Sequence, residues 1–230
     1  MRRVAAVSLM AVLMARSAAG QVGSPPEHSP YVDAPFSGEL TALGGWFSGN
    51  TGKAGVGPQS APVAGGRFEW HLGGPMGLGL RFARAFSDRT VINPLVFSGR
   101  VLGTTSQPMY FFDTDLMLSL TGQKTWHKLM PIVQAGLGLT TDFGQDKDIG
   151  GYALGTSFAL NFGVGVRWIP SRRWQLRLDA TDNVFQQSYP NSYFSPPIDG
   201  GTPVLNPTEG QNEWNHSFMA TLGISWLFRK

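Results

Sequence analysis

Nine charged side chains stand at alternate positions within apolar segments of this 230-residue chain, and their types could support chemistry. They comprise five acids and four arginines: Glu39, Arg67, Glu69, Arg81, Asp113, Asp115, Arg167, Arg177 and Asp179. An isolated buried charge is very costly, so charges that leave water must pair. We therefore predict an ion-pair network inside the protein. The alternative is a narrow channel that opens for small solutes when the ion pairs rearrange. The near balance of positive and negative charge argues against strong ion selectivity in such a channel.

The segment Glu213-Trp214-Asn215-His216-Ser217 is the nearest approach to a catalytic pattern. A histidine activates a serine nucleophile only when the two side chains lie within hydrogen-bond reach. Adjacent residues of a strand point to opposite faces, so His216 and Ser217 cannot share a proton directly. The sequence predicts that the protein is not an enzyme and that His216 lies at a rim.

The chain offers no pattern typical of a metal or cofactor site. Asp113 and Asp115 share a face but lack a third ligand or a suitably spaced histidine. His28, His71 and His127 are too scattered in sequence for metal ligation. We predict no metal, no cofactor and, because the chain has no cysteine, no disulfide framework.

The segment from Ser157 to Phe185 indicates which elements position the charges. Its even positions from Phe158 to Trp168 are large and apolar, and the positions between them are small or polar. The alternation resumes at Trp174, after a short basic turn, and a period of two predicts strands. Two such strands form an antiparallel hairpin, and about ten residues is the length of a tilted strand that crosses a bilayer.

The same alternation recurs along the chain and predicts eight strands. Their ranges are 36–47, 63–72, 76–86, 109–120, 129–141, 157–168, 174–185 and 217–228. Long and short connections alternate between them, as in outer-membrane barrels with short periplasmic turns and longer extracellular loops. We predict an all-β fold, an eight-stranded antiparallel up-and-down transmembrane barrel over residues 36–228.

The ends and the composition agree with export. Residues 1–20 have the basic, apolar and small-residue regions of a signal peptide, with cleavage expected after Ala19 or Gly20. We expect residues 21–35 to be a disordered periplasmic leader. Three of the 18 basic residues lie in the signal, which leaves 15 basic against 15 acidic residues. This balance excludes the basic excess that nucleic-acid binding needs.

The side chains between the apolar positions decide which face meets lipid. They are dominated by glycine, serine, threonine, alanine and asparagine, which fit a narrow lumen and would make a poor soluble surface. A secreted lipocalin-like barrel, apolar inside, is the alternative. Aromatic residues gather at the strand ends, as in interfacial girdles. The predicted girdle consists of Trp46, Phe86, Tyr110, Trp168, Trp174, Trp226 and Phe228.

Four segments carry a resemblance to a known family: GLGLTTDF, FALNFGVGVRWIP, LRLDATDNVF and FMATLGISWLF. With these the chain resembles the small eight-stranded outer-membrane barrels of the OmpA/OmpX type, over about residues 36–228. The resemblance implies a protein of the outer membrane of a Gram-negative-type bacterium, in contact with its lipids. We expect a monomer with a plugged lumen that works through its extracellular loops.

The loop 186–215 is the candidate contact region. Tyr189, Tyr193 and Phe194 lie beside prolines and could form an exposed aromatic surface for an extracellular or envelope protein partner. An ordinary mobile loop is the alternative.

Overall fold

The computed structural model describes residues 29–144 and 146–228, and its long strands follow the period-two alternation of the sequence. The predicted signal peptide, residues 21–28 of the leader and the last two residues lie outside the described part of the chain. The eight long strands are β2 (Gly38–Ser48), β3 (Ala61–Gly73), β4 (Met76–Ala85), β7 (Met109–Ser119), β9 (Leu129–Thr141), β10 (Thr156–Trp168), β11 (Trp174–Ser188) and β12 (Asn212–Phe228).

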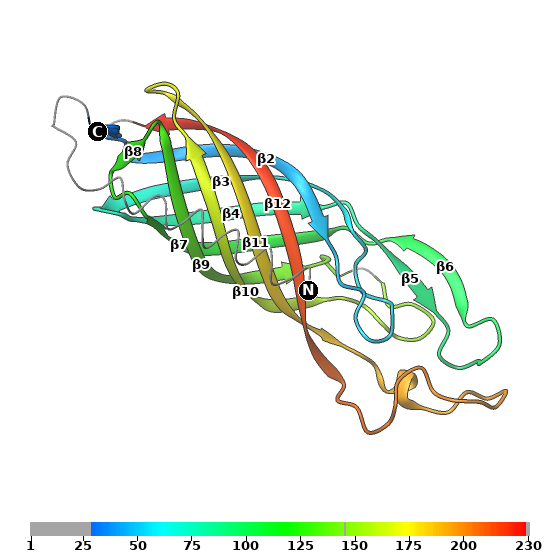
Figure 1. Ribbon diagram of the computed structural model, residues 1–230. Coiled ribbons are helices and arrows are strands. Elements are labelled where there is room, and N and C mark those ends of the chain that lie inside the picture. Colours follow the sequence, from blue (N-terminus) through cyan, green and yellow to red (C-terminus); the bar gives the residue numbers. More distant parts are fainter. Residues whose placement is uncertain (1–28, 145, 229–230) are drawn as a thin grey trace, which may run out of the picture.

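These strands close into a barrel. Each pairs antiparallel with the next, and β12 pairs with β2 through a register that runs from Phe218↔Ser48 to Phe228↔Gly38 (Figure 1). All eight predicted strands are present, so the predicted antiparallel up-and-down barrel is confirmed. Among residues 29–144 and 146–228, no helix is long and apolar enough to cross a membrane.

The two ends of the barrel differ. At one end, here the turn end, the chain reverses through short connections after β3, β7 and β10. At the other, the loop end, four long loops cover residues 49–60, 86–108, 142–155 and 189–211. These loops contain a separate two-stranded sheet of β5 (Asp88–Ile92) and β6 (Val101–Ser106), and the 3₁₀ helix η3 (Asn191–Phe194).

The leader is partly ordered, which corrects the prediction for residues 31–33. There β1 (Tyr31–Asp33) pairs antiparallel with β8 (Lys124–Trp126), a short strand in the connection between β7 and β9. Flanking backbone bonds extend the contact, since the Ala34 amide donates to the Gln123 carbonyl at 2.9 Å. The many prolines of this segment indicated disorder. Its pairing with β8 is a long-range contact, which local composition does not encode.

Alternation places three layers of side chains inside the barrel. Near the turn end a base layer comprises Phe36, Met117, Met130, Ile132 and Leu227. The nine charged residues form an ionic layer above it. Toward the loop end a lumen apolar layer comprises Leu43, Phe47, Val63, Ala83, Ala85, Met109, Phe111, Ala159, Phe185 and Met219.

Candidate functional site

The barrel lumen holds all nine charged residues that the sequence singled out. Each lies at an inward position of its strand and is at most 7% exposed. Inward placement follows from the alternation, because outward neighbours on the same strands are large and apolar. The structure brings these residues into three connected groups, around Arg177 and Arg167, around Arg67, and around Arg81.

Arg177 on β11 is the centre of the largest group. Its Nε donates to Asp179 Oδ2 at 2.6 Å, and its Nη1 donates to Glu69 Oε2 at 2.6 Å and to Glu39 Oε1 at 3.1 Å. Its Nη2 donates to Gln134 Oε1 at 2.9 Å. One guanidinium thereby links side chains of four strands, which its fork of donors makes possible.

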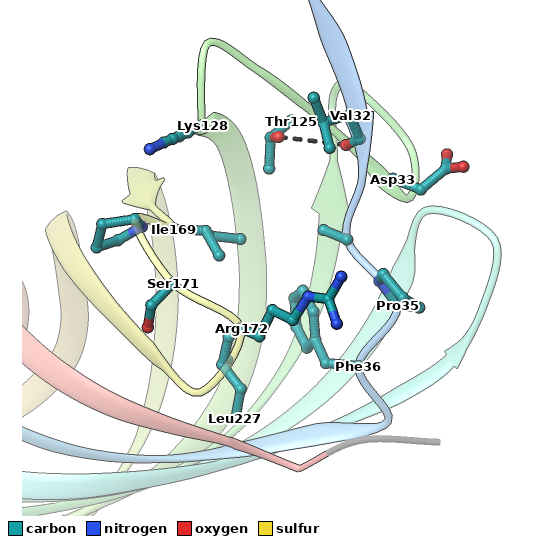
Figure 2. A pocket seen from close by; sticks show the side chains of 12 residues that line it. Val32, Asp33, Pro35, Phe36, Thr125, Lys128, Ile169, Ser171, Arg172 and Leu227 are labelled. Carbon is teal, nitrogen blue, oxygen red and sulfur yellow. Dashed lines mark hydrogen bonds between the residues drawn. The ribbon is translucent and has the colours of Figure 1, made fainter.

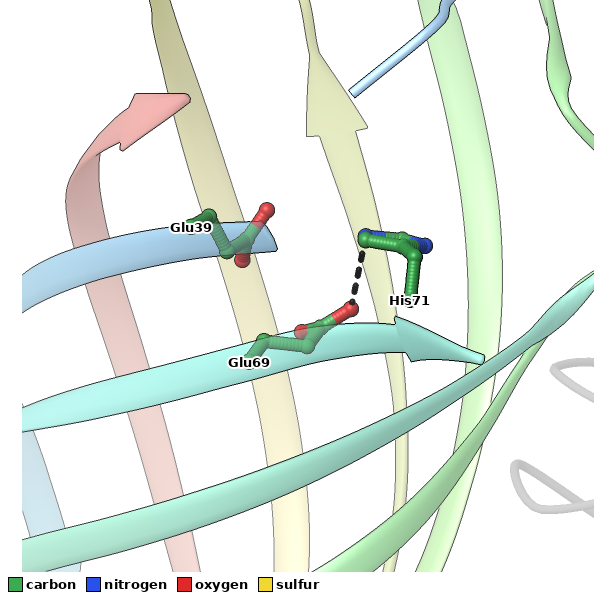
Figure 3. Close-up of side chains that lie close together, drawn as sticks. All are labelled: Glu39, Glu69 and His71. Atoms are coloured by element: carbon green, nitrogen blue, oxygen red, sulfur yellow. Dashed lines mark ion pairs between the residues drawn. The ribbon is translucent and has the colours of Figure 1, made fainter. Parts of the chain in front are cut away.

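Arg167 on β10 completes this group from the other side. It pairs with Glu69, and its Nη1 lies 3.5 Å from Glu39 Oε2 and 3.4 Å from His71 Nε2. The side chains of Glu39, Glu69 and His71 converge, with one ligand-type atom of each within 4.8 Å of the others (Figure 3). Such a trio could hold a cation, but both carboxylates already bind arginines. The geometry therefore favours an ion-pair cluster.

The other two groups are ion pairs with carboxylates of β7, one from β3 on the far side of β4 and one from the neighbouring strand β4. Arg67 Nη1 lies 2.8 Å from Asp115 Oδ2, and Arg81 Nε donates to Asp113 Oδ2 at 2.8 Å. On β9, glycines lie opposite these two carboxylates of β7 and leave room for them. A Cβ added at Gly136 would overlap an oxygen of Asp115. The strand glycines of β9 thus serve the packing of the lumen charges.

Amide and hydroxyl side chains complete the ionic layer, and the sequence analysis missed them. Arg81 also donates to Asn183 at 2.6 Å and to Thr181 at 3.1 Å, and Gln175 donates to Glu39 at 2.7 Å. Their signal was available, because they occupy the same inward register as the charges. The positions of the charged residues alone do not reveal them.

The loop end carries a second buried cluster, here the loop core. All four long loops contribute to it: Ala54, Val56, Ile92, Tyr152, Tyr189, Tyr193 and Leu205. The rings of Tyr152 and Tyr189 stack with centroids 5.9 Å apart, and Tyr189 donates from its hydroxyl to Glu213 at 2.9 Å. Burial raises the pKa of all three tyrosines, so their hydroxyls stay neutral far into the alkaline range.

The prediction of an exposed aromatic contact surface in loop 186–215 is therefore wrong for its two tyrosines. Tyr189 is 3% exposed and Tyr193 is fully buried, while Phe194 is half-buried against the loop core. The physical reason is that residues distant in sequence, from the other three loops, cover these rings. Sequence patterning within one loop carries no trace of that packing.

An ion pair missed by the sequence analysis joins the loops beside this core. Buried Arg89 on β5 pairs with Asp148 at 2.9 Å, donates to Gln107 at 3.1 Å and lies with its guanidinium 5.3 Å from the centre of the Tyr152 ring. Gln107 in turn donates to Asp142 at 2.8 Å. The loops at this end are thus tied together by both apolar and charged contacts.

The outer surface of the barrel is apolar between two rings of aromatic residues. Trp168, Trp174, Trp226 and Phe228 are exposed at the turn end, and Trp46 and Phe86 are exposed at the loop end. Tyr110 is half-buried beside the Arg84 guanidinium, which lies 5.3 Å from its ring centre. Large exposed apolar residues cover the strands between the rings, among them Leu80, Leu137, Val164, Leu178 and Leu222.

His216 and Ser217 point to opposite sides of β12, as the strand geometry predicts. His216 is exposed on the outer surface and Ser217 is fully buried in the lumen. Nδ1 of His216 lies 2.7 Å from Oδ2 of Asp182 on β11, a partner that the sequence analysis missed. The pair lies outside the barrel, next to Trp214 and Phe218 in the outward register.

Comparisons with known proteins give similarities of structure alone. No protein-family model matches the sequence, and no curated protein matches it significantly. The N-terminal β-barrel domain of Pseudomonas aeruginosa OprF is 16% identical with a TM-score of 0.48, covering 84% of this chain and 98% of that one. Neisserial surface protein A (NspA) is 14% identical with a TM-score of 0.46, covering 87% and 98%.

A third similar structure, OprG from Pseudomonas aeruginosa, is 12% identical with a TM-score of 0.46 and covers 86% of this chain and 99% of that one. These values assign neither family nor activity. The chain's own strand registers, which run in sequence order and close from β12 onto β2, make it an eight-stranded antiparallel barrel.

Proposed function

We propose that the protein is an integral barrel of the outer membrane of a Gram-negative-type bacterium, plugged against solutes and not an enzyme. One observation carries this proposal: the outward surface is an apolar band bounded by aromatic rings, while the nine charged residues of the ionic layer face inward. Lipid requires such a surface, because charged side chains that face hydrocarbon destabilise a barrel by about 2–4 kcal/mol at mid-depth.

The turn end faces the periplasm and the loop end faces outward in this proposal. Outer-membrane barrels carry short turns on the periplasmic side and long loops outside. The lengths of the strands fit, since β4 has 10 residues and β12 has 17, against the roughly 9–11 that a spanning strand needs. The surplus length of β12 extends beyond the membrane toward the loops.

A plugged lumen is supported by the three layers of buried side chains. The ionic layer crosses the lumen through Arg167 and Arg177, and the lumen apolar layer lies between it and the loops. A solute would have to displace both. The apolar layer adds a barrier to ions, because a charge that enters it loses its hydration without gaining a partner.

The surface role falls to the loop end, where the protein meets its surroundings. With the loop tyrosines buried, other apolar residues provide the contact surface. Exposed apolar side chains there include Leu95, Phe97, Val101, Leu102 and Ile198. The Ile198 amide donates to the Leu95 carbonyl at 2.9 Å, so two loops present this surface together.

The test is refolding into lipid bilayers followed by conductance recording. We expect a band whose gel mobility differs between boiled and unboiled samples, and no steady single-channel current. Steady current would replace the plugged barrel with the narrow channel. A protein that is folded in buffer without detergent or lipid would instead support the lipocalin-like alternative and overturn the membrane assignment.

A further inference from the structure

A pocket of about 580 Å³ lies at the turn end, outside the lumen layers. The ordered leader forms one wall, and β8 and the turn between β10 and β11 form the others (Figure 2). A hydrogen bond from Thr125 Oγ1 to the Val32 carbonyl, 3.2 Å long, holds the leader wall in place. The volume of the pocket is within the roughly 300–1,000 Å³ range of small-molecule sites.

The walls of this pocket are mainly apolar. Val32, Ala34, Phe36, Ile169 and Leu227 contribute side chains to it. Phe36 and Leu227 also belong to the base layer, so the floor of the pocket is the underside of the lumen packing. A ligand that fits here must have an apolar body.

Two cationic side chains, Lys128 and Arg172, also line the pocket. Neither makes an ion pair or a side-chain hydrogen bond within residues 29–144 and 146–228. In Figure 2 the Arg172 guanidinium reaches across the pocket toward Pro35 and Phe36, while the Asp33 carboxylate points away from it. The register pairs Asp33 with Lys124 on β8, which adds a further cation beside the one acid of the lining.

The backbone that carries Lys128 is in an unfavourable conformation. His127 and Lys128 form the two-residue turn between β8 and β9 with φ of 50° and 67°. Turns of this kind favour Asn-Gly, because side chains other than glycine and asparagine resist positive φ. Strained residues concentrate at binding and catalytic sites, and here one such residue carries a cation that lines the pocket.

We propose that this pocket binds a small organic anion with an apolar body, such as an aromatic or aliphatic carboxylate, from the aqueous phase at the turn end. Arg172 and Lys128 bind the anionic group, and the apolar walls take up the body. The proposal does not depend on whether the lumen conducts.

The experiment uses the full chain in nanodiscs of zwitterionic lipid, with methyl groups of isoleucine and leucine labelled for NMR. Naphthylacetate is the probe, and naphthylacetamide is its neutral counterpart of nearly the same shape. We expect saturable shifts of the Ile169 and Leu227 methyl signals with naphthylacetate. The amide, which lacks the charge, is expected to bind about tenfold more weakly.

Arg172→Ala is the decisive variant and Arg173→Ala is its control, since both remove one arginine from the same turn but only Arg172 lines the pocket. We expect Arg172→Ala to weaken naphthylacetate binding about tenfold and Arg173→Ala to leave it nearly unchanged. Lys128→Gln provides a second variant should Arg172→Ala fail the gel-mobility test for folding. Equal binding of the two probes, equal effects of the two arginine variants, or shifts that never saturate would each overturn the proposal.

Discussion

At the scale of single residues, Arg177 has the most demanding position in the molecule. It is 1% exposed and contacts Glu39, Glu69 and Asp179 at once. A buried ion pair adds little net stability compared with apolar residues of the same volume, but removing one partner leaves the others uncompensated. Arg177 therefore contributes to stability chiefly because it compensates the buried carboxylates around it.

Replacing Arg177 with methionine should lower the free energy of unfolding by about 3–5 kcal/mol, because buried carboxylates lose their cation. Urea unfolding in lipid bilayers, followed by the gel-mobility shift, measures this change. Arg172→Met is the matched control, since Arg172 is exposed and should give a change near zero. Similar midpoints for the two variants would contradict the role of Arg177 in the ionic layer.

Two of the loop tyrosines differ in the hydrogen bonding of their hydroxyl groups, so we expect replacement by phenylalanine to affect stability differently at the two positions. Tyr189 donates to Glu213, whereas the hydroxyl of Tyr193 is buried with no hydrogen-bond partner among the described residues. Tyr189→Phe should destabilise the loop core by about 0.5–1.5 kcal/mol, and Tyr193→Phe should be neutral or slightly stabilising. Hydrogen exchange of loop amides measures both. Equal loss of protection in the two variants would refute this difference.

At the scale of elements, the eight barrel strands were predictable and the loop packing was not. Alternation such as that from Phe158 to Trp168 reports two environments on two sides of one strand, so it locates strands and assigns their faces. The same signal located the lumen charges. The fold class and the inward positions therefore followed from short-range patterns.

The elements that escaped prediction depend on contacts between distant segments. Strand β1 forms because its backbone pairs with β8, some ninety residues later in sequence. Each of the two strands is only three residues long, too short for an alternating pattern to indicate it. The burial of Tyr193 likewise depends on the other three loops. Arg89 and Asp148 are 59 positions apart in sequence, and no local sequence pattern predicts that they form an ion pair.

At the scale of the whole molecule, the apolar band makes a prediction that separates membrane from soluble barrels. Leu222 is exposed midway along β12, between Phe218 and Trp226. In a membrane Leu222→Arg should cost about 2–4 kcal/mol, because the arginine would face hydrocarbon at mid-depth. Stability in bilayers, measured as for Arg177, reports the cost.

Ile198→Arg is the control for this measurement. Ile198 is 86% exposed in a long loop, outside the apolar band, so the same change of side chain should leave stability unaltered. A soluble barrel would tolerate both substitutions. Equal and small effects would therefore place the band in water and contradict the membrane assignment.

The closure of β12 onto β2 has a consequence for how the molecule is made. The first and last barrel strands are hydrogen-bonded neighbours, so the ring is complete only when nearly the whole chain is present. Contacts of such high sequence separation slow folding, because the entropy of joining distant segments is lost before the pairing is gained. Until then β2 and β12 each present an unpaired edge, the kind of surface that aggregates. A nascent chain of this protein would thus need protection of those two edges, whatever the mature barrel does.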